Sequence, residues 1–456
     1  MTVTINNNSI SQKNITFNSK PNIIKESHLF KEVDKSLKPL NTFIKSQENL
    51  SSTRFIQDVV TNWVPKVVFT RSLADFTEMT FLEYTESALF YFAPALLGGV
   101  FHKAFSKFAP KNLRNEINEN IPKSTEAIVK DAKLVQTGLA KRVLPIKAAI
   151  VLACVSIPAA EYALSFAKNL LTLNLFKKSD FSNVVNLNKH ETQFESREQQ
   201  DKVRNSAKKH IKNAGKLSAL VLGGSVFLAG FGHKSEALQK VSKVILQPGG
   251  SIFKLLNKLG VKSEKVGKAL KTYINFDFDT KNGKLGLSKG QLVVSTFSGF
   301  FGYSEAGKDR GKLDQYEVWT RVPLVVFYTI FGSAIFDHAF KHILVKKNKF
   351  PDLIKKSPDG TINIPARAEL PDLAEKVAKI KKTPVQTEFN RLLKEKAIII
   401  AIPYGFSLVF MGFLLAGITR FWTQYRYNQA KKNPQSNSTF NNFTGANADN
   451  FKKFML

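Results

Sequence analysis

The sequence predicts an all-α protein, a polytopic membrane helix bundle of five or six apolar helices, and three observations support this prediction. The segment from Ala397 to Thr419 is 23 residues long and carries no charge, which is long enough for a helix to cross an apolar layer about 30 Å thick. Several shorter apolar segments precede it. Lysine and arginine gather beside the ends of these segments, as they do beside the cytoplasmic ends of membrane helices.

Six apolar segments are candidate helices of this bundle. In chain order they are Phe81 to Phe101, Ala148 to Phe176, Leu217 to Gly232, Gly290 to Tyr303, Val322 to Phe336 and Ala397 to Thr419. The second is too long for one straight crossing, and Pro158, Glu161 and Lys168 interrupt it. The fourth is the weakest, because Ser, Thr and Gly make up much of it. For each short segment, a buried core helix is the alternative.

These segments divide the chain into parts of different character. The predicted parts are a disordered N-terminal tail (1–27), amphipathic helices (28–80), a first membrane helix unit (81–176), a central region with the third apolar helix and a basic amphipathic helix (177–289), a second membrane helix unit with a large basic loop (290–427) and a disordered C-terminal tail (428–456). The tails are rich in Asn and Ser and poor in aliphatic residues, so they lack the apolar surface that folding requires.

The flanking charges also predict directions, because Lys and Arg close to an apolar end are retained in the cytoplasm. The segments 81–101 and 322–336 should run from outside to inside, whereas 148–176 and 397–419 should start inside. The segment 217–232 is also preceded by lysines, which conflicts with a single crossing by 148–176. The conflict disappears if 148–176 is a broken hairpin, or if 290–303 spans the membrane as well.

Part of the second membrane unit resembles the first. At an offset of 235 residues the matching positions are Phe101 with Phe336, Ala104 with Ala339 and Phe105 with Phe340. At an offset of 249 residues the matching positions are Lys147 with Lys396, Ala148 with Ala397 and Ile150 with Ile399. These matches predict an internal duplication of a two-helix unit. Chance similarity between apolar helices is the alternative.

The charge of the chain favours anionic partners, because Lys and Arg total 67 against 36 for Asp and Glu, a net charge of +31. The anionic headgroups of a lipid bilayer fit better than nucleic acid, since the basic residues flank the apolar segments and most aromatic residues lie inside those segments. Protein partners at the loops or tails are a further expectation. The single cysteine, Cys154, excludes an intrachain disulfide, and we expect its side chain to be buried.

A basic amphipathic helix is predicted from Ser251 to Ile274. The lysines that share about a third of its circumference are Lys254, Lys258, Lys262, Lys265 and Lys268. Aliphatic residues gather on the opposite side, which is the pattern of a helix that lies on an anionic membrane surface. A solvated basic face on a helix that packs against protein is the alternative.

Two small groups of residues are candidates for chemistry. Glu83, Glu86 and Glu161 are the acids nearest to the apolar segments, and they are possible transport acids because ionisable groups inside a membrane normally face the bundle interior. Positions at an interface or a turn are the alternative for them.

The weak candidates for a metal site are Asp337, His338 and His342, since two histidines four residues apart share one helix face. The glutamate of a zincin motif is absent between them, and Lys341 would repel a cation. Polar residues that end an apolar helix are the favoured interpretation.

The sequence contains no coherent catalytic set, no phosphate-binding loop and no cofactor motif, so no cofactor is expected. The leading hypothesis is therefore an integral membrane protein that acts as a non-enzymatic scaffold or interaction protein. A secondary transporter or channel is the alternative, because transporters often combine repeated units with interrupted helices. A membrane-embedded metal-dependent enzyme is a distant third.

Overall fold

The computed structural model describes residues 28–48, 59–188, 195–260, 263–277, 288–357 and 362–432. Within these residues nearly every element is a helix, and the single sheet pairs β1 (Lys355–Lys356) with β2 (Ile362–Asn363) in antiparallel register. The all-α class predicted from the sequence is confirmed. The predicted tail 1–27 lies outside the described residues, and so does 433–456 of the predicted tail 428–456.

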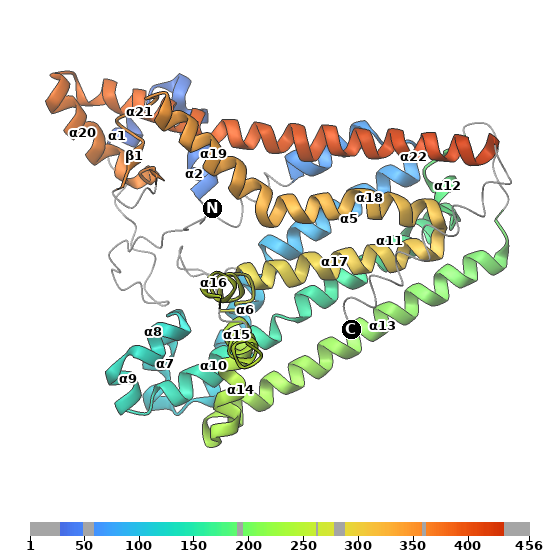
Figure 1. The fold of residues 1–456 in the computed structure, drawn as a ribbon, viewed down its shortest axis with the longest axis horizontal. Coiled ribbons are helices and arrows are strands. Elements are labelled where there is room, and N and C mark those ends of the chain that lie inside the picture. Colours follow the sequence, from blue (N-terminus) through green and yellow to red (C-terminus); the bar gives the residue numbers. More distant parts are fainter. Residues whose placement is uncertain are drawn as a thin grey trace.

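Six helical rods lie along the long axis of the molecule (Figure 1). The rods are α5 (Leu73–Tyr91) with α6 (Ala93–Phe105), α10 (Ala140–Ala153) with α11 (Ser156–Phe176), α13 (Arg197–Phe231), α17 (Lys289–Arg310), α18 (Lys312–Phe327) with α19 (Ser333–Lys346), and α21 (Val385–Ser407) with α22 (Leu415–Lys432). A π-helical segment joins the two halves of each of the last two rods, Tyr328–Gly332 in one and Leu408–Leu414 in the other.

Successive rods alternate in direction along the chain (Figure 1). Ser298 of α17 donates to the Pro158 carbonyl of α11, and Asn169 of α11 donates to the Ala306 carbonyl of α17, so these two rods run parallel with α13 between them in sequence. The segment 148–176 therefore belongs to one rod and does not form a hairpin. The segment 290–303 lies within the rod α17, which is not among the helices long and apolar enough to cross a membrane.

Three helices of the described chain are long and apolar enough to cross a membrane, namely Ala140–Phe176, Arg197–Lys234 and Val385–Lys432. A fourth is reached if the pair Lys312–Gly332 and Ile335–Lys346, bent by 45°, counts as one span. This is fewer than the five or six apolar helices predicted. The rods α5–α6 and α17 are not among these helices. Acidic residues lower the mean hydropathy of α5–α6, and many glycines and serines lower that of α17.

Serine side chains set the start of several rods. Ser72 accepts from the Asp75 amide at the start of α5, which places this start before the predicted residue 81. Ser288 and Gln291 form a capping box at the start of α17. At the other end of the chain α22 continues to Lys432, so the first residues of the predicted tail 428–456 are helical.

Shorter helices cover the ends of the rods. They are α1 (His28–Lys31), α2 (Lys38–Glu48), a π-helical segment (Val59–Trp63), α4 (Val64–Val68), α7 (Arg114–Asn120), α8 (Thr125–Lys130), α9 (Ala132–Gln136), α12 (Phe181–Val184), α14 (Glu236–Leu246), α15 (Pro248–Lys258), α16 (Glu264–Tyr273) and α20 (Leu370–Lys381), with short 3-10 turns at Lys35–Leu37, Ser106–Phe108, Lys111–Leu113, Gly232–Lys234 and Arg367–Glu369. One apolar core joins α7 and α8 to α10 through Ile117 and Ile128, and another joins α2 to α21 through Ile44 and Phe389.

Large apolar side chains remain exposed on the outer faces of three rods. Leu220 of α13 is 75% exposed, Ile418 of α22 57% and Phe327 of α18 55%. Exposure of these side chains to water costs about 25 cal/mol of free energy for each Å² of apolar surface. Exposed apolar faces of this kind mark a surface that contacts lipid or another protein.

Candidate functional site

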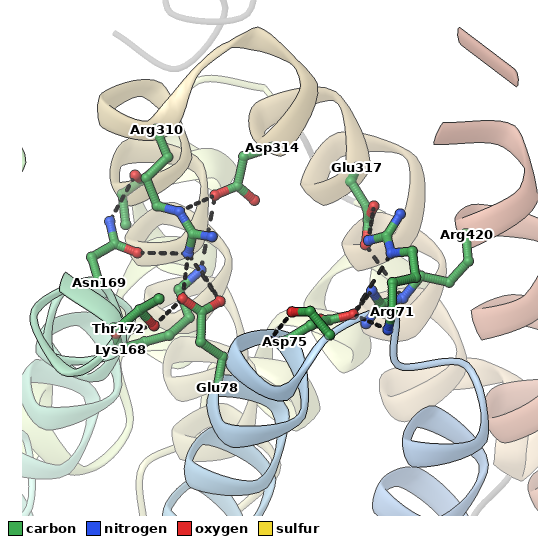
Figure 2. Close-up of polar contacts among 12 residues, drawn as sticks. Arg71, Asp75, Glu78, Lys168, Asn169, Thr172, Arg310, Asp314, Glu317 and Arg420 are labelled. Atoms are coloured by element: carbon green, nitrogen blue, oxygen red, sulfur yellow. Dashed lines mark hydrogen bonds and ion pairs between the residues drawn. The ribbon is translucent and has the colours of Figure 1, made fainter. Parts of the chain in front are cut away.

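Eight charged side chains gather inside the bundle at the end where α5 and α18 begin (Figure 2). Four are basic and four are acidic, and they are Arg71, Asp75, Glu78, Lys168, Arg310, Asp314, Glu317 and Arg420. Seven of the eight residues are buried, and the side chain of the eighth, Arg71, is 15% exposed. Because the removal of a charge from water costs several kcal/mol, so many buried charges require close partners.

Four of these side chains form a closed ring of alternating charge, here called the first ring. Arg71 lies 3.6 Å from Asp75 and 3.3 Å from Glu317, measured from guanidinium nitrogen to carboxylate oxygen. Arg420 closes the ring, 2.7 Å from Asp75 and 3.7 Å from Glu317. Each charge in the first ring therefore contacts two charges of the opposite sign.

The other four side chains form the second ring. Arg310 lies 2.9 Å from Glu78 and 3.3 Å from Asp314. The Lys168 ammonium lies 3.9 Å from both of these acids. Neutral groups complete this ring, since Asn169 accepts from Arg310 at 3.1 Å and the Thr172 hydroxyl donates to Glu78.

Two helices contribute acids to both rings. Asp75 and Glu78 are three residues apart on α5, and Asp314 and Glu317 are three residues apart on α18, so each pair lies on one helix face. Asp75 and Asp314 also lie in the first turn of their helices, where the helix dipole stabilises a carboxylate. The turn between α17 and α18 is made by Gly311, whose φ of 116° disfavours other residues.

Neighbouring charges shift the pKa of Asp75 in the first ring and of Arg310 in the second. Burial raises the pKa of Asp75, but Arg420 and Arg71 lower it more, so the pKa of this carboxyl lies below its usual value. Burial lowers the pKa of Arg310, but Glu78 and Asp314 raise it more, so the guanidinium is held in its charged form. Both groups are therefore ionised in the neutral pH range.

The possible transport acids lie deeper along the same bundle. Glu83 is paired with Lys66, and both side chains are buried. Glu86 accepts a hydrogen bond of 3.1 Å from the Tyr303 hydroxyl. Glu161 is buried in α11. Glu83 and Glu161 are thus buried and Glu86 is half-buried, and none of the three is a member of either ring.

The predicted basic helix from Ser251 to Ile274 is in fact two helices, α15 and α16. Gly260 has a φ of 93° and ends the first, and Gly267 lets α16 pack against the Phe253 ring. The lysines that the structure describes are exposed, namely Lys254, Lys258, Lys265 and Lys268, whereas Lys262 lies outside the described residues. The prediction of one continuous helix was wrong because helical spacing alone does not show where a glycine reverses the chain.

The weak metal candidates lie on α19. Asp337 is paired with Lys341 at 2.5 Å, and the rings of His338 and His342 are in contact with centroids 4.4 Å apart. In the part of the chain that the structure describes, no group of three or more His, Cys, Asp or Glu side chains has the arrangement of a metal site. Cys154, expected to be buried, is buried.

The sequence analysis missed the two rings. Most members of the rings lie just outside the apolar segments, so they are not among the acids nearest to those segments. A signal was present nevertheless, because the spacing of Arg71, Asp75 and Glu78 is the same as that of Arg310, Asp314 and Glu317.

Comparison with known proteins supplies no family for this chain. No protein-family model matches the sequence, and no curated protein and no solved structure matches it.

Proposed function

We propose that this chain is a multi-pass integral membrane protein that acts as a non-enzymatic scaffold at an anionic membrane. The three long apolar helices support the membrane assignment. The exposed apolar faces of α13, α18 and α22 support it as well, since lipid would cover them.

The closed form of the two rings is the observation that carries the scaffold proposal. Every charge in the rings already contacts two opposite charges of the protein. A catalytic or ion-binding carboxylate must instead offer its oxygens to a substrate or an ion. Closed ion pairs hold five of the six rods in one arrangement, which suits a protein whose task is to present surfaces to partners.

The hairpin of α15 and α16 supports the anionic membrane as a partner. Both helices are seen end-on in Figure 1, so they cross the axis of the rods as helices in the plane of a membrane surface would. Leu255 is 59% exposed and Leu259 72%, next to the exposed Lys254 and Lys258. Apolar side chains that enter the headgroup layer beside lysines that meet lipid phosphates explain this combination.

A secondary transporter is the second candidate function. The burial of Glu83 and Glu161 inside the bundle favours it, because buried ionisable groups mark many ion and proton paths. A proton or ion flux into reconstituted vesicles that is lost on Glu161→Gln would distinguish it from a scaffold.

The membrane assignment predicts a position-dependent effect of a new charge on the last rod. Val409→Arg should impair insertion by about 2.5 to 3.5 kcal/mol, because Val409 is 56% exposed in the middle of the uncharged segment. Asn428→Arg, at an exposed position near the end of the same rod, is the matched control and should insert normally. The measurement is the fraction of each variant that stays with membranes in alkaline carbonate. Release of the wild-type protein by carbonate would contradict the assignment.

The hairpin makes a second prediction. An environment-sensitive dye on Leu259→Cys, in a Cys154→Ala background, should report an apolar surrounding in nanodiscs of acidic lipid. The signal should weaken in neutral lipid and at high salt, because the screening length falls from about 10 Å at 0.1 M to about 3 Å at 1 M.

Val135→Cys is the control for the dye experiment, since Val135 is also exposed but lies on α9 outside the hairpin. A Leu259 signal that is the same in neutral and acidic lipid, whatever the salt, would show that the lysines do not bind headgroups.

A further inference from the structure

We infer that the two rings are one interface between two equivalent halves of this chain, related to each other by a local two-fold axis. The first evidence is a repeated spacing. Arg71, Asp75 and Glu78 recur as Arg310, Asp314 and Glu317 at a constant offset of 239 residues. In both places the arginine precedes the helix and the two acids lie in its first two turns.

The contacts of one ring become those of the other when these residues are exchanged. The pair Arg71–Asp75 corresponds to Arg310–Asp314, Arg71–Glu317 to Arg310–Glu78, Arg420–Asp75 to Lys168–Asp314, and Arg420–Glu317 to Lys168–Glu78. All four contacts therefore have a counterpart. The exchange pairs Arg420 of the last rod with Lys168 of the second rod as equivalent bases.

One aromatic side chain marks where the axis passes. Phe181 of α12 lies 5.7 Å from the Arg71 guanidinium and 5.7 Å from that of Arg310, measured to the ring centroid. Ala74 and Leu313 also belong to the apolar cluster around Phe181, and they too are 239 residues apart. Equivalent residues on both sides of a single side chain are the arrangement expected at a symmetry axis.

The far ends of the rods show the same correspondence. Phe101 stacks on Phe105, with ring planes 9° apart, and Phe336 stacks on Phe340, with planes 1° apart. In each half the first rod is interrupted, at Phe92 in one and at the π-helical segment Tyr328–Gly332 in the other. The matched residues before these interruptions include Arg71, Asp75 and Glu78 at an offset of 239, and those after them are matched at an offset of 235.

The second rods of the halves share a buried lysine as well. The buried Lys147 donates to the Lys123 carbonyl, and the buried Lys396 donates to the Pro365 carbonyl at 2.7 Å. In both cases a buried ammonium group attaches a long rod to the folded segment that precedes it. The resemblance of Lys147 to Lys396 therefore extends from the sequence to their hydrogen bonds.

The interface is self-complementary, as the interface of a symmetric dimer is. Each half offers one arginine, two acids and one further base, and the partner that fits this surface is the other half. The helices α5 and α18 each carry one acid of the first ring and one acid of the second. A movement of either helix must therefore open both rings. The two rings should therefore behave as a single cooperative joint.

The test uses the full-length protein in detergent. Lys168→Arg gives the second ring the base that the first ring has, and Arg420→Lys does the reverse. Both variants should therefore keep the midpoint temperature of unfolding of the wild-type protein. Lys147→Arg is the matched control, because its equivalent Lys396 is also a lysine and the Lys147 side chain is fully buried. This control should lower the midpoint by about 5 °C. A loss at Lys168→Arg as large as that of the control would overturn the equivalence.

A second measurement tests whether the rings open together. Glu317→Gln removes an acid from the first ring alone. Hydrogen exchange should then increase not only in α22 but also around Lys168 and Asn169 of the second ring. Glu78→Gln should produce the reciprocal increase around Arg420. Exchange confined to the ring that carries the substitution would show two independent clusters and would overturn the proposal of one joint.

Discussion

Replacing Arg310 with methionine should lower the free energy of unfolding by about 3 to 5 kcal/mol, because this removes one partner from a buried ion pair. The guanidinium is 1% exposed and contacts both Glu78 and Asp314. Without it, these two buried acids share Lys168 as their remaining base in the second ring. Denaturant unfolding in one fixed detergent, followed by circular dichroism, would measure the change.

Two further variants make this result specific. Arg310→Met combined with Asp314→Asn leaves Glu78 and Lys168 as a neutral pair, so part of the lost stability should return. Arg204→Met removes an arginine whose ion pair with Asp201 is exposed, and this change should stay within about 0.5 kcal/mol. An Arg310 variant as stable as the Arg204 variant would show that the second ring does not stabilise the fold.

Replacing Lys147 with methionine should have an effect of similar size, about 3 to 5 kcal/mol. Lys147 is fully buried, lies 2.5 Å from Asp277, and also donates to the Lys123 carbonyl. Asp277 in turn accepts from the Thr125 amide at 2.6 Å. The loss of this ammonium leaves a buried carboxylate without its base at the point where the α15–α16 hairpin joins the bundle.

The Lys147 prediction has its own signature. Protease cleavage within 263–277 should become faster in Lys147→Met than in the wild-type protein, because the attachment of the hairpin is weakened. Asp277→Asn added to Lys147→Met should recover part of the stability by removing the unpaired charge. Lys141→Met, at an exposed position on the same helix, is the control and should change neither measurement. Equal stability of Lys147→Met and Lys141→Met would contradict the expected role of the pair.

The order of the apolar helices could be predicted from the sequence because hydropathy is a local property of the chain. The uncharged run from Ala397 to Thr419 lies in one continuous rod. Hydropathy does not show where single residues begin or end a helix. The hairpin at Gly260 and the start of α5 at Ser72 both depend on single residues that periodicity does not weigh.

The sequence by itself determined the all-α class and the positions of its most apolar helices, because both follow from the spacing of apolar residues along a few turns of chain. Only the tertiary structure decided which charges meet. Arg71 and Glu317 are 246 residues apart in sequence yet in contact in the first ring. A buried charge is tolerated only beside its partner, and the chain order does not state which distant helix supplies that partner.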